Sequence, residues 1–124
     1  MKKISQKQVL RLHSLAIEET GGIDGVRDNS MLDSALQSPL QTLTGDDIYP
    51  TIESKAARLC YSLINNHPFL DGNKRIGILI LIIFLEINEI IINCNNNELI
   101  DLGLGIASGQ YDSNYIESWI ISHK

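Results

Sequence analysis

The apolar residues of this chain recur mainly at intervals of three and four positions, the spacing that lines one face of an α-helix. Ser5, followed three residues later by Gln8, has the form of a capping box and predicts a helix that runs to about Glu19. Its inward stripe is expected to consist of Val9, Leu12, Leu15 and Ala16. The GGIDG sequence at residues 21–25 should form a loop, after which Asp28 is a suitable N-cap for a second helix. Both patterns indicate amphipathic helices.

The clearest helical periodicity covers residues 52–64. Its apolar positions fall on one stripe: Ile52, Ala56, Leu59, Cys60, Leu63 and Ile64. Pro68 disfavours helical geometry at His67, so this helix should end at about Asn66. Residues 76–87 are almost purely apolar, and the segment of about 15 residues from about Asn73 to about Asn88 has no turn signal, which favours a helix over a strand. Because this helix is apolar on all sides, we expect it at the centre of the fold, surrounded by the others.

Two more helices are predicted in the last part of the chain. Asn95 and Glu98 form another box-like start, and a final helix begins at about Asp112. Their inward residues would be Leu99, Leu102, Ile106, Ile116, Trp119 and Ile120. Residues 40–50 are expected to form either an exposed loop or a short hairpin. The prediction is an all-α fold, with residues 1–124 forming a single domain of about six helices around a central apolar helix.

Composition and charge narrow the classes of function. Hydrophobic residues make up 44% of the chain, which is sufficient for one core. The net charge of -5 argues against direct nucleic-acid binding, which requires a basic surface. Cys60 and Cys94 match neither a disulfide framework nor a metal-ligand spacing. The apolar run is shorter than a membrane span, and the first residues do not resemble a signal peptide, so we expect a cytoplasmic protein without membrane contact.

The most polar stretch, HPFLDGNKR at residues 67–75, lies directly against the apolar run. If a helix begins at about residue 73, the N–H groups of its first turn have no partner within the helix and lie at the positive end of the helix dipole. That arrangement suits a phosphate. Gly72 lets a ligand approach the backbone closely, while Lys74 and Arg75 add positive charge. Asn73 can donate and accept hydrogen bonds in the same place.

The residues before this predicted phosphate site suggest a reaction. Asp71 is placed to hold a Mg²⁺ ion that bridges the phosphates, since Mg²⁺ usually takes only one or two protein carboxylates. His67 could accept a proton from an attacking hydroxyl, because histidine is largely neutral at pH 7. Phe69 is expected to enter the core and fix the loop.

Each of these residues also has an ordinary structural role. An Asp-Gly pair is commonly a turn, an Asn before a helix is commonly an N-cap, and a lone His between helices usually packs. Lys74 and Arg75 favour the anion site, because basic residues in a first helical turn oppose the dipole. A purely structural helix start would favour acidic residues there.

Other candidates have simpler interpretations. Gly103 and Gly105 flank one residue within a helical stretch, which indicates a close helix contact rather than a nucleotide loop. His13 is expected to be a surface or half-buried residue. Arg27 could reach an anion or pair with a neighbouring acid, and we favour the pairing.

The stretch at residues 67–75 resembles the signature loop of the Fic/Doc family, whose pattern is H-P-F-x-(D/E)-G-N-x-R followed two residues later by a second Arg. Within that family it is most similar to the Doc ("death on curing") toxins of toxin–antitoxin systems. GGIDGVRDNSMLDSAL, the acidic loop that ends at Tyr49 and Pro50, and the chain length extend the resemblance to essentially the whole chain.

Two positions differ from the family members that transfer AMP. Lys74 replaces their Gly, and Ile78 replaces their second Arg. Doc toxins resemble this chain at both positions, which implies that ATP binds in the opposite orientation and that its γ-phosphate is transferred. An apolar Ile78 cannot hold a phosphate, which agrees with a changed orientation.

The resemblance implies that His67 is the catalytic base, that Asp71 holds Mg²⁺, and that residues 72–75 bind ATP. It implies phosphorylation of a Thr of elongation factor Tu, which halts translation. It also implies a Phd-like antitoxin that acts in trans, because none of the seven Glu residues is followed by Gly or Asn as in the family's inhibitory helix. Two alternatives stay open: AMP transfer, and a non-catalytic module that binds a partner peptide.

Overall fold

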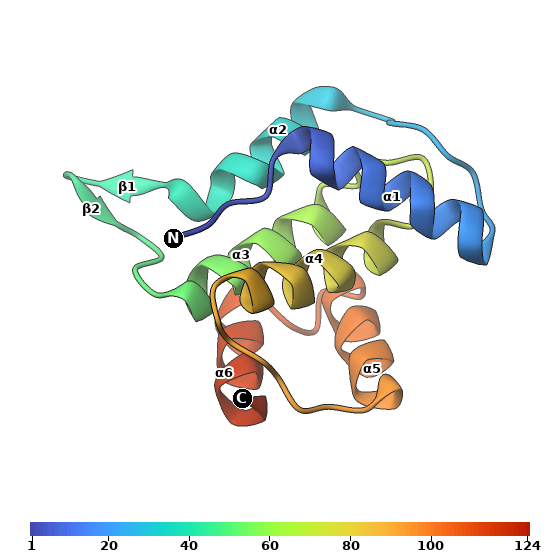
Figure 1. Ribbon diagram of the computed structural model, residues 1–124. Helices are drawn as coiled ribbons and strands as arrows, with labels where there is room; N and C mark the ends of the chain where they lie inside the picture. The colour runs from blue at the N-terminus through green and yellow to red at the C-terminus, as the bar shows by residue number, and fades with distance from the viewer.

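The computed structural model describes residues 1–124 and consists mainly of α-helices (Figure 1). The helices are α1 (Gln6–Thr20), α2 (Asn29–Gln37), α3 (Ile52–Asn65), α4 (Asn73–Ile87), α5 (Asn96–Ala107) and α6 (Ser113–His123). A short 3₁₀ helix, η1 (Ser38–Leu40), follows α2. The strands β1 (Thr42–Leu43) and β2 (Asp46–Asp47) pair in an antiparallel hairpin. The predicted all-α fold is confirmed, and of the two alternatives for residues 40–50 the structure has the hairpin.

The helices form three layers (Figure 1). α3 and α4 lie side by side in the middle, α1 and α2 cover one side of this pair, and α5 and α6 cover the other. The predicted central position of α4 is confirmed, and α3 shares it because α3 packs against both outer layers. The outer side of α4 stays only half-buried at Leu79, Ile82 and Ile83. Long apolar residues therefore reach the surface along this helix.

One continuous core joins all six helices. Its fully buried side chains include Val9, Leu32, Leu63, Ile64, Phe69, Ile76, Ile80, Leu81, Leu85, Leu102, Ile106, Ile116 and Ile120. The loop between α3 and α4 contributes Phe69, which confirms that this ring anchors the polar stretch. α3 and α4 approach closely because residue 77 is Gly: an added Cβ would lie 2.5 Å from Cγ1 of Ile64. A Cβ at Gly105 would lie 2.1 Å from the Tyr111 ring, so the close contact there is made by the loop that follows α5 and not, as the sequence had suggested, by another helix.

Short-range signals set most helix starts. The N-cap residues whose side chains accept a hydrogen bond from the first turn are Ser5, Asp28, Thr51, Asn95 and Asp112. The capping boxes predicted at Ser5 and Asn95 are both present. Such caps satisfy N–H groups that have no partner inside the helix. The start of α4 has no side-chain cap.

The buried face of α1 differs from the predicted stripe. Val9, His13 and Ile17 are buried, whereas Leu15 is 45% exposed. The apolar pattern placed Leu15 inward, but the polar His13 lies inward instead because its ring stacks on Phe69 with 3.8 Å between ring centres. The prediction that His13 lies at or near the surface is therefore wrong.

The hairpin lies at the end of α3 that is remote from the polar stretch (Figure 1). Lys55 ties it to α3, because its ammonium group donates to Asp47 at 3.1 Å and to the carbonyl of Tyr49. The polar stretch follows the other end of α3, about 20 Å away along the helix axis. The hairpin therefore does not cover that stretch. None of the helices combines the length and the apolar character needed to cross a bilayer.

Candidate active site at the start of the apolar helix

An open groove of about 870 Å³ lies between the start of α4 and one face of α5. All six residues that the sequence suggested for a site line this groove: His67, Asp71, Gly72, Asn73, Lys74 and Arg75. The opposite wall is apolar and consists of Leu99, Ile100, Gly103, Leu104 and Ala107. On this wall Ile100 and Leu104 are 57% and 51% exposed, so the groove combines a cationic side with an accessible apolar side.

The start of α4 is open to a ligand. Gly72 occupies the N-cap position with left-handed backbone angles (φ 78°, ψ 20°) and provides no side-chain acceptor for the first turn. Lys74 and Arg75 are exposed in that turn, and Nη1 of Arg75 donates to the carbonyl of Gly21 at 3.1 Å. Free N–H groups, the helix dipole and two cations therefore coincide at one end of the groove, as phosphate binding requires.

His67 directly follows the C-cap of α3 and lines the same groove. Its side chain is exposed, whereas the next two residues, Pro68 and Phe69, are buried. The backbone of His67 has a positive φ of 47°, which is uncommon for a residue other than glycine. The loop therefore presents the imidazole to the groove while its neighbours anchor the chain in the core.

The Asp71 carboxylate is fixed by main-chain donors. Its Oδ2 accepts from the N–H of Ile23 at 3.2 Å, and its Oδ1 accepts from the N–H of Gly72 at 2.8 Å. These bonds, the one from Ile23 first, lower the pKa of Asp71 below its ordinary value, so the carboxylate is ionised at neutral pH.

An ionised Asp71 carboxylate fits a divalent cation. No cluster of three or more His, Cys, Asp or Glu side chains exists that could hold a metal without other ligands. A Mg²⁺ ion at Asp71 would take its remaining ligands from phosphate oxygens and water, which is the usual arrangement for this ion. The donor set is thus compatible with a metal that arrives together with a nucleotide.

Asn73 makes contacts that the sequence did not reveal. Its side-chain amide donates to the carbonyl of Phe69 at 3.0 Å, and its Oδ1 accepts from the N–H of Phe69 at 3.0 Å. The side chain thus closes the loop between α3 and α4. A direct role in phosphate binding stays a prediction for Asn73, whereas its role in holding the loop is visible.

His13 also supports the site, although it lies 58 positions from Asp71 in the sequence. Its Nε2 donates to the carbonyl of Asp71 at 2.7 Å, and its side chain is 2% exposed. The other ring nitrogen lies 3.5 Å from Asp24. No signal in the sequence indicates this contact, because it depends on how α1 packs against the loop.

Comparison with protein-family models matches residues 3–85 to the Fic/DOC family. The chain belongs to the Fic/Doc family. Among curated proteins, "Toxin Doc" of Mycolicibacterium smegmatis is 40% identical over 87 residues, which is 70% of this chain and 65% of that protein. "Protein kinase doc" of Escherichia phage P1 is 27% identical over 110 residues, which is 89% of this chain and 86% of the phage protein. The alignment with the Mycolicibacterium protein thus spans just under two thirds of its length.

The Fic/Doc match covers only one wall of the groove. All six predicted site residues lie within residues 3–85, whereas α5 and its apolar wall begin beyond them. The resemblance to the Fic/Doc signature is therefore confirmed as a family relationship, and the cationic wall is the part that the family pattern describes. The apolar wall lies outside the family model, although the alignment with the phage protein, over 110 of the 124 residues, is long enough to include α5.

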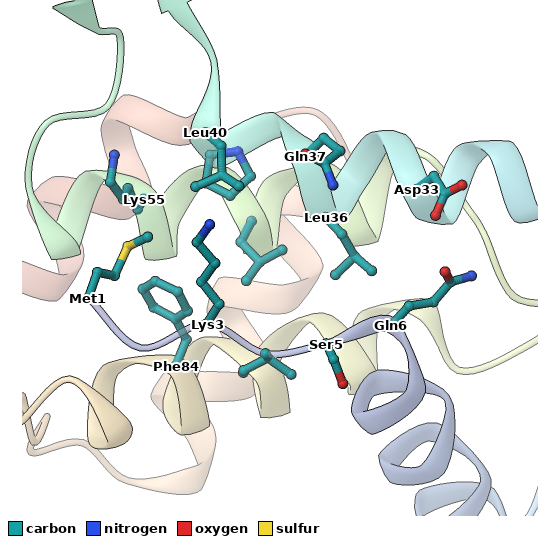
Figure 2. A pocket seen from close by; sticks show the side chains of 13 residues that line it. Met1, Lys3, Ser5, Gln6, Asp33, Leu36, Gln37, Leu40, Lys55 and Phe84 are labelled. Carbon is teal, nitrogen blue, oxygen red and sulfur yellow. The ribbon is translucent and has the colours of Figure 1, made fainter.

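A second, smaller hollow of about 270 Å³ lies beside the N-terminal residues, away from the start of α4 (Figure 2). It is bounded by the N-terminal residues, α2 with η1, the start of α3 and the end of α4, and Phe84 forms part of its wall. Lys3 and Lys55 are its cations, and Lys55 is already paired with Asp47. The hollow contains no histidine, and the N-cap of the α-helix that starts beside it, Ser5, accepts a hydrogen bond from the first turn, so it lacks the combination of groups found in the larger groove.

Proposed function

We propose that this chain is a Doc-type toxin that transfers the γ-phosphate of ATP to a threonine hydroxyl of a protein. The observation that carries the proposal is the groove in which His67 lies beside the uncapped, cationic start of α4. The names of two relatives, "Toxin Doc" and "Protein kinase doc", support the same class of function.

Each wall of the groove would bind a different part of ATP. The phosphates would lie against the N–H groups of the first turn of α4, with Lys74 and Arg75 balancing their charge. Ile100 and Leu104 would provide an apolar surface for the base. Mg²⁺ bound with the nucleotide would neutralise charge on the phosphates, and Asp71 is the carboxylate that would hold it.

His67 would act as the general base. It would accept the proton of the threonine hydroxyl while the hydroxyl oxygen forms a bond to the γ-phosphorus. The bond from that phosphorus to the β–γ bridging oxygen breaks, and ADP leaves with the electron pair. Phosphoryl transfer depends mainly on positioning and charge neutralisation, so the residues of one groove would be sufficient.

Ile78 favours phosphate transfer over AMP transfer. It is half-buried and lines the groove one helical turn beyond Lys74. An apolar side chain there cannot bind the phosphate that a second arginine would hold, so the proposed orientation of ATP presents the γ-phosphate to His67.

The proposed target is a threonine of elongation factor Tu in the cytoplasm, and its modification would halt translation and growth. A Phd-like antitoxin would neutralise the toxin in trans. The relationship to a protein named "Toxin Doc" supports such a partner. The lack of an inhibitory Glu-Gly or Glu-Asn pair within these 124 residues supports it as well.

Incubation with ATP labelled separately at the α- and γ-phosphorus tests the reaction. We expect label to reach elongation factor Tu from the γ position only, with release of ADP. Transfer from the α position would replace the proposal with AMP transfer. Absence of any transfer, with tight binding of a partner protein, would replace it with a non-catalytic module.

His67→Ala tests the catalytic assignment. We expect at least a 100-fold loss of transfer, about the contribution of a general base, and a loss of growth arrest at equal expression. His123→Ala is the matched control, because it removes an imidazole at the end of α6, outside the groove. The assignment of His67 is wrong if both variants transfer phosphate equally well while circular dichroism shows both to be folded.

A further inference from the structure

Arg27 holds the backbone of His67 and of both its neighbours. Its Nε donates to the carbonyl of His67 at 2.6 Å, and its Nη2 donates to the carbonyl of Asn66 at 3.0 Å. Its main-chain N–H donates to the carbonyl of Pro68 at 2.8 Å. The pairing with an acid that the sequence favoured for Arg27 is therefore wrong, and a single residue binds three consecutive carbonyl groups.

The peptide that Arg27 binds is held in an unfavourable conformation. His67 has a φ of 47°, and such left-handed angles persist outside glycine only where the surroundings enforce them. Pro68 restricts this position further, because the residue before a proline avoids helical angles. The two bonds from the Arg27 guanidinium end on the carbonyls of Asn66 and His67, one on each side of the His67 Cα. They therefore fix the direction in which the Cβ of His67 points.

The contacts that orient His67 are made to its main chain rather than to its ring. The side chain is exposed in the groove, and the bond from Arg27 ends on the carbonyl oxygen. A catalytic histidine is often oriented by a partner on its second ring nitrogen. Here the direction of the imidazole depends on the backbone, and the backbone depends on the planar fork of an arginine, which a lysine cannot reproduce.

We propose that Arg27 is a positioning residue for His67, which acts through the carbonyls of residues 66 and 67 and does not touch the substrate. The inference rests on the proposed role of His67 as base, and it adds a residue outside the signature loop to the machinery for phosphate transfer. Arg27 does not line the groove, so its removal should disturb proton transfer and leave nucleotide binding intact.

Arg27→Ala and Arg27→Lys test this positioning role, with Arg11→Ala as a matched control on the exposed face of α1. We expect both Arg27 variants to lower kcat by about 100-fold with little change in KM for ATP, because small displacements of a reacting group have effects of that size. Added guanidinium ions should restore activity to Arg27→Ala and leave Arg11→Ala unchanged. Equal kcat values for Arg27→Lys and wild type would overturn the requirement for a fork.

The ¹H–¹³C NMR signal of the His67 ring provides a readout that does not depend on catalysis. We expect it to shift and broaden in Arg27→Ala and Arg27→Lys and to stay in place in Arg11→Ala. An unchanged signal in folded Arg27 variants would overturn the positioning role even if the wild type transfers phosphate. A shifted signal in a protein that transfers no phosphate would uphold the contact and refute the proposed function. If Arg27→Ala does not fold, Arg27→Lys decides the outcome.

Discussion

The start of α4 and the starts of the other five helices are built in different ways. The other five each have a side chain that accepts a hydrogen bond from the first turn: Ser5, Asp28, Thr51, Asn95 and Asp112. α4 begins with Gly72 instead, has no side-chain cap, and continues with Lys74 and Arg75. The closed helix starts contribute to stability, whereas the open one leaves the N–H groups of its first turn free at the end of a groove.

This difference implies a cost in stability at the site. Cations in a first helical turn are unfavourable by about 0.3–1 kcal/mol each, and an absent cap forgoes about 1 kcal/mol. α4 tolerates both because its apolar side chains, Ile76, Ile80, Leu81 and Leu85, are fully buried. The burial of its apolar side chains therefore allows α4, the most apolar helix of the fold, to begin without a side-chain cap.

Lys74→Glu should separate binding from stability most strongly. Loss of a charged phosphate contact removes about 1.5–3 kcal/mol, so we expect the affinity for ATP to fall by about 10- to 100-fold in calorimetric titrations. The same change should raise the free energy of unfolding by about 0.3–1 kcal/mol, because an acid suits a helix N-terminus.

Lys7→Glu is the matched control for Lys74→Glu, because Lys7 is exposed in the first turn of α1, which Ser5 caps. We expect a similar gain in stability and unchanged ATP affinity. If both variants lose affinity equally, the loss reflects net charge and the distinction between open and closed helix starts fails.

His13→Leu should weaken the loop that supports the open start. Leu retains apolar bulk but leaves the carbonyl of Asp71 without its donor, which costs about 1–3 kcal/mol in the free energy of unfolding by urea. His13→Gln can supply an N–H in a similar place and should recover part of the loss. If His13→Leu has the same free energy of unfolding as the wild type, the bond from His13 to the carbonyl of Asp71 does not contribute to stability.

Thr51→Ala removes the cap of α3, a closed helix start far from the groove. We expect a loss of about 1 kcal/mol in the free energy of unfolding and no change in phosphate transfer. Urea denaturation and the γ-label assay measure the two quantities. A loss of transfer in the folded variant would show that the two kinds of helix start are coupled.

The smallest expected effect concerns the closed start of α5. Nε2 of His123 lies 2.8 Å from Glu98, and its Nδ1 lies 2.6 Å from the carbonyl of Trp119. That carbonyl first, and Glu98 second, raise the pKa of His123 above its ordinary value. A raised pKa in the folded state means that the stabilisation is complete below the unfolded pKa of about 6.5 and disappears as the pH rises through the folded pKa.

The His123→Gln variant tests this pH dependence. We expect its urea midpoint to lie below that of the wild type at pH 5.5, and the difference to shrink by pH 8.5. A difference that stays constant or grows with pH would show that the pair with Glu98 does not depend on protonation of His123.

The sequence was sufficient for features that depend on neighbouring residues. The capping boxes at Ser5 and Asn95 and the helix break before Pro68 follow from spacings of one to four positions, and all were predicted. The six site residues belong to one nine-residue stretch, so their location in one groove could be predicted as well.

The residues that the sequence could not reveal act across long separations. His13 reaches Asp71 and Arg27 reaches His67 only because α1 and the loop before α2 fold over the signature loop. The apolar pattern of α1 predicted that Leu15 is buried and that His13 is not, and the structure shows the reverse. A hydrogen-bonded imidazole ring can replace an apolar side chain in a core. The contacts of Asn73 with Phe69 could not be predicted either, because the sequence does not show whether an asparagine amide bonds its own loop or a ligand.

The missing side chain at residue 77 has a consequence for the reaction geometry. Ile64 of α3 occupies the space that a methyl group at this position would need, so the two central helices are in contact one turn into α4. His67, the proposed proton acceptor, follows α3, and the proposed phosphate site lies at the start of α4. The absence of a side chain at residue 77 therefore fixes the separation of the two helices that carry the proposed catalytic residue and the proposed phosphate site.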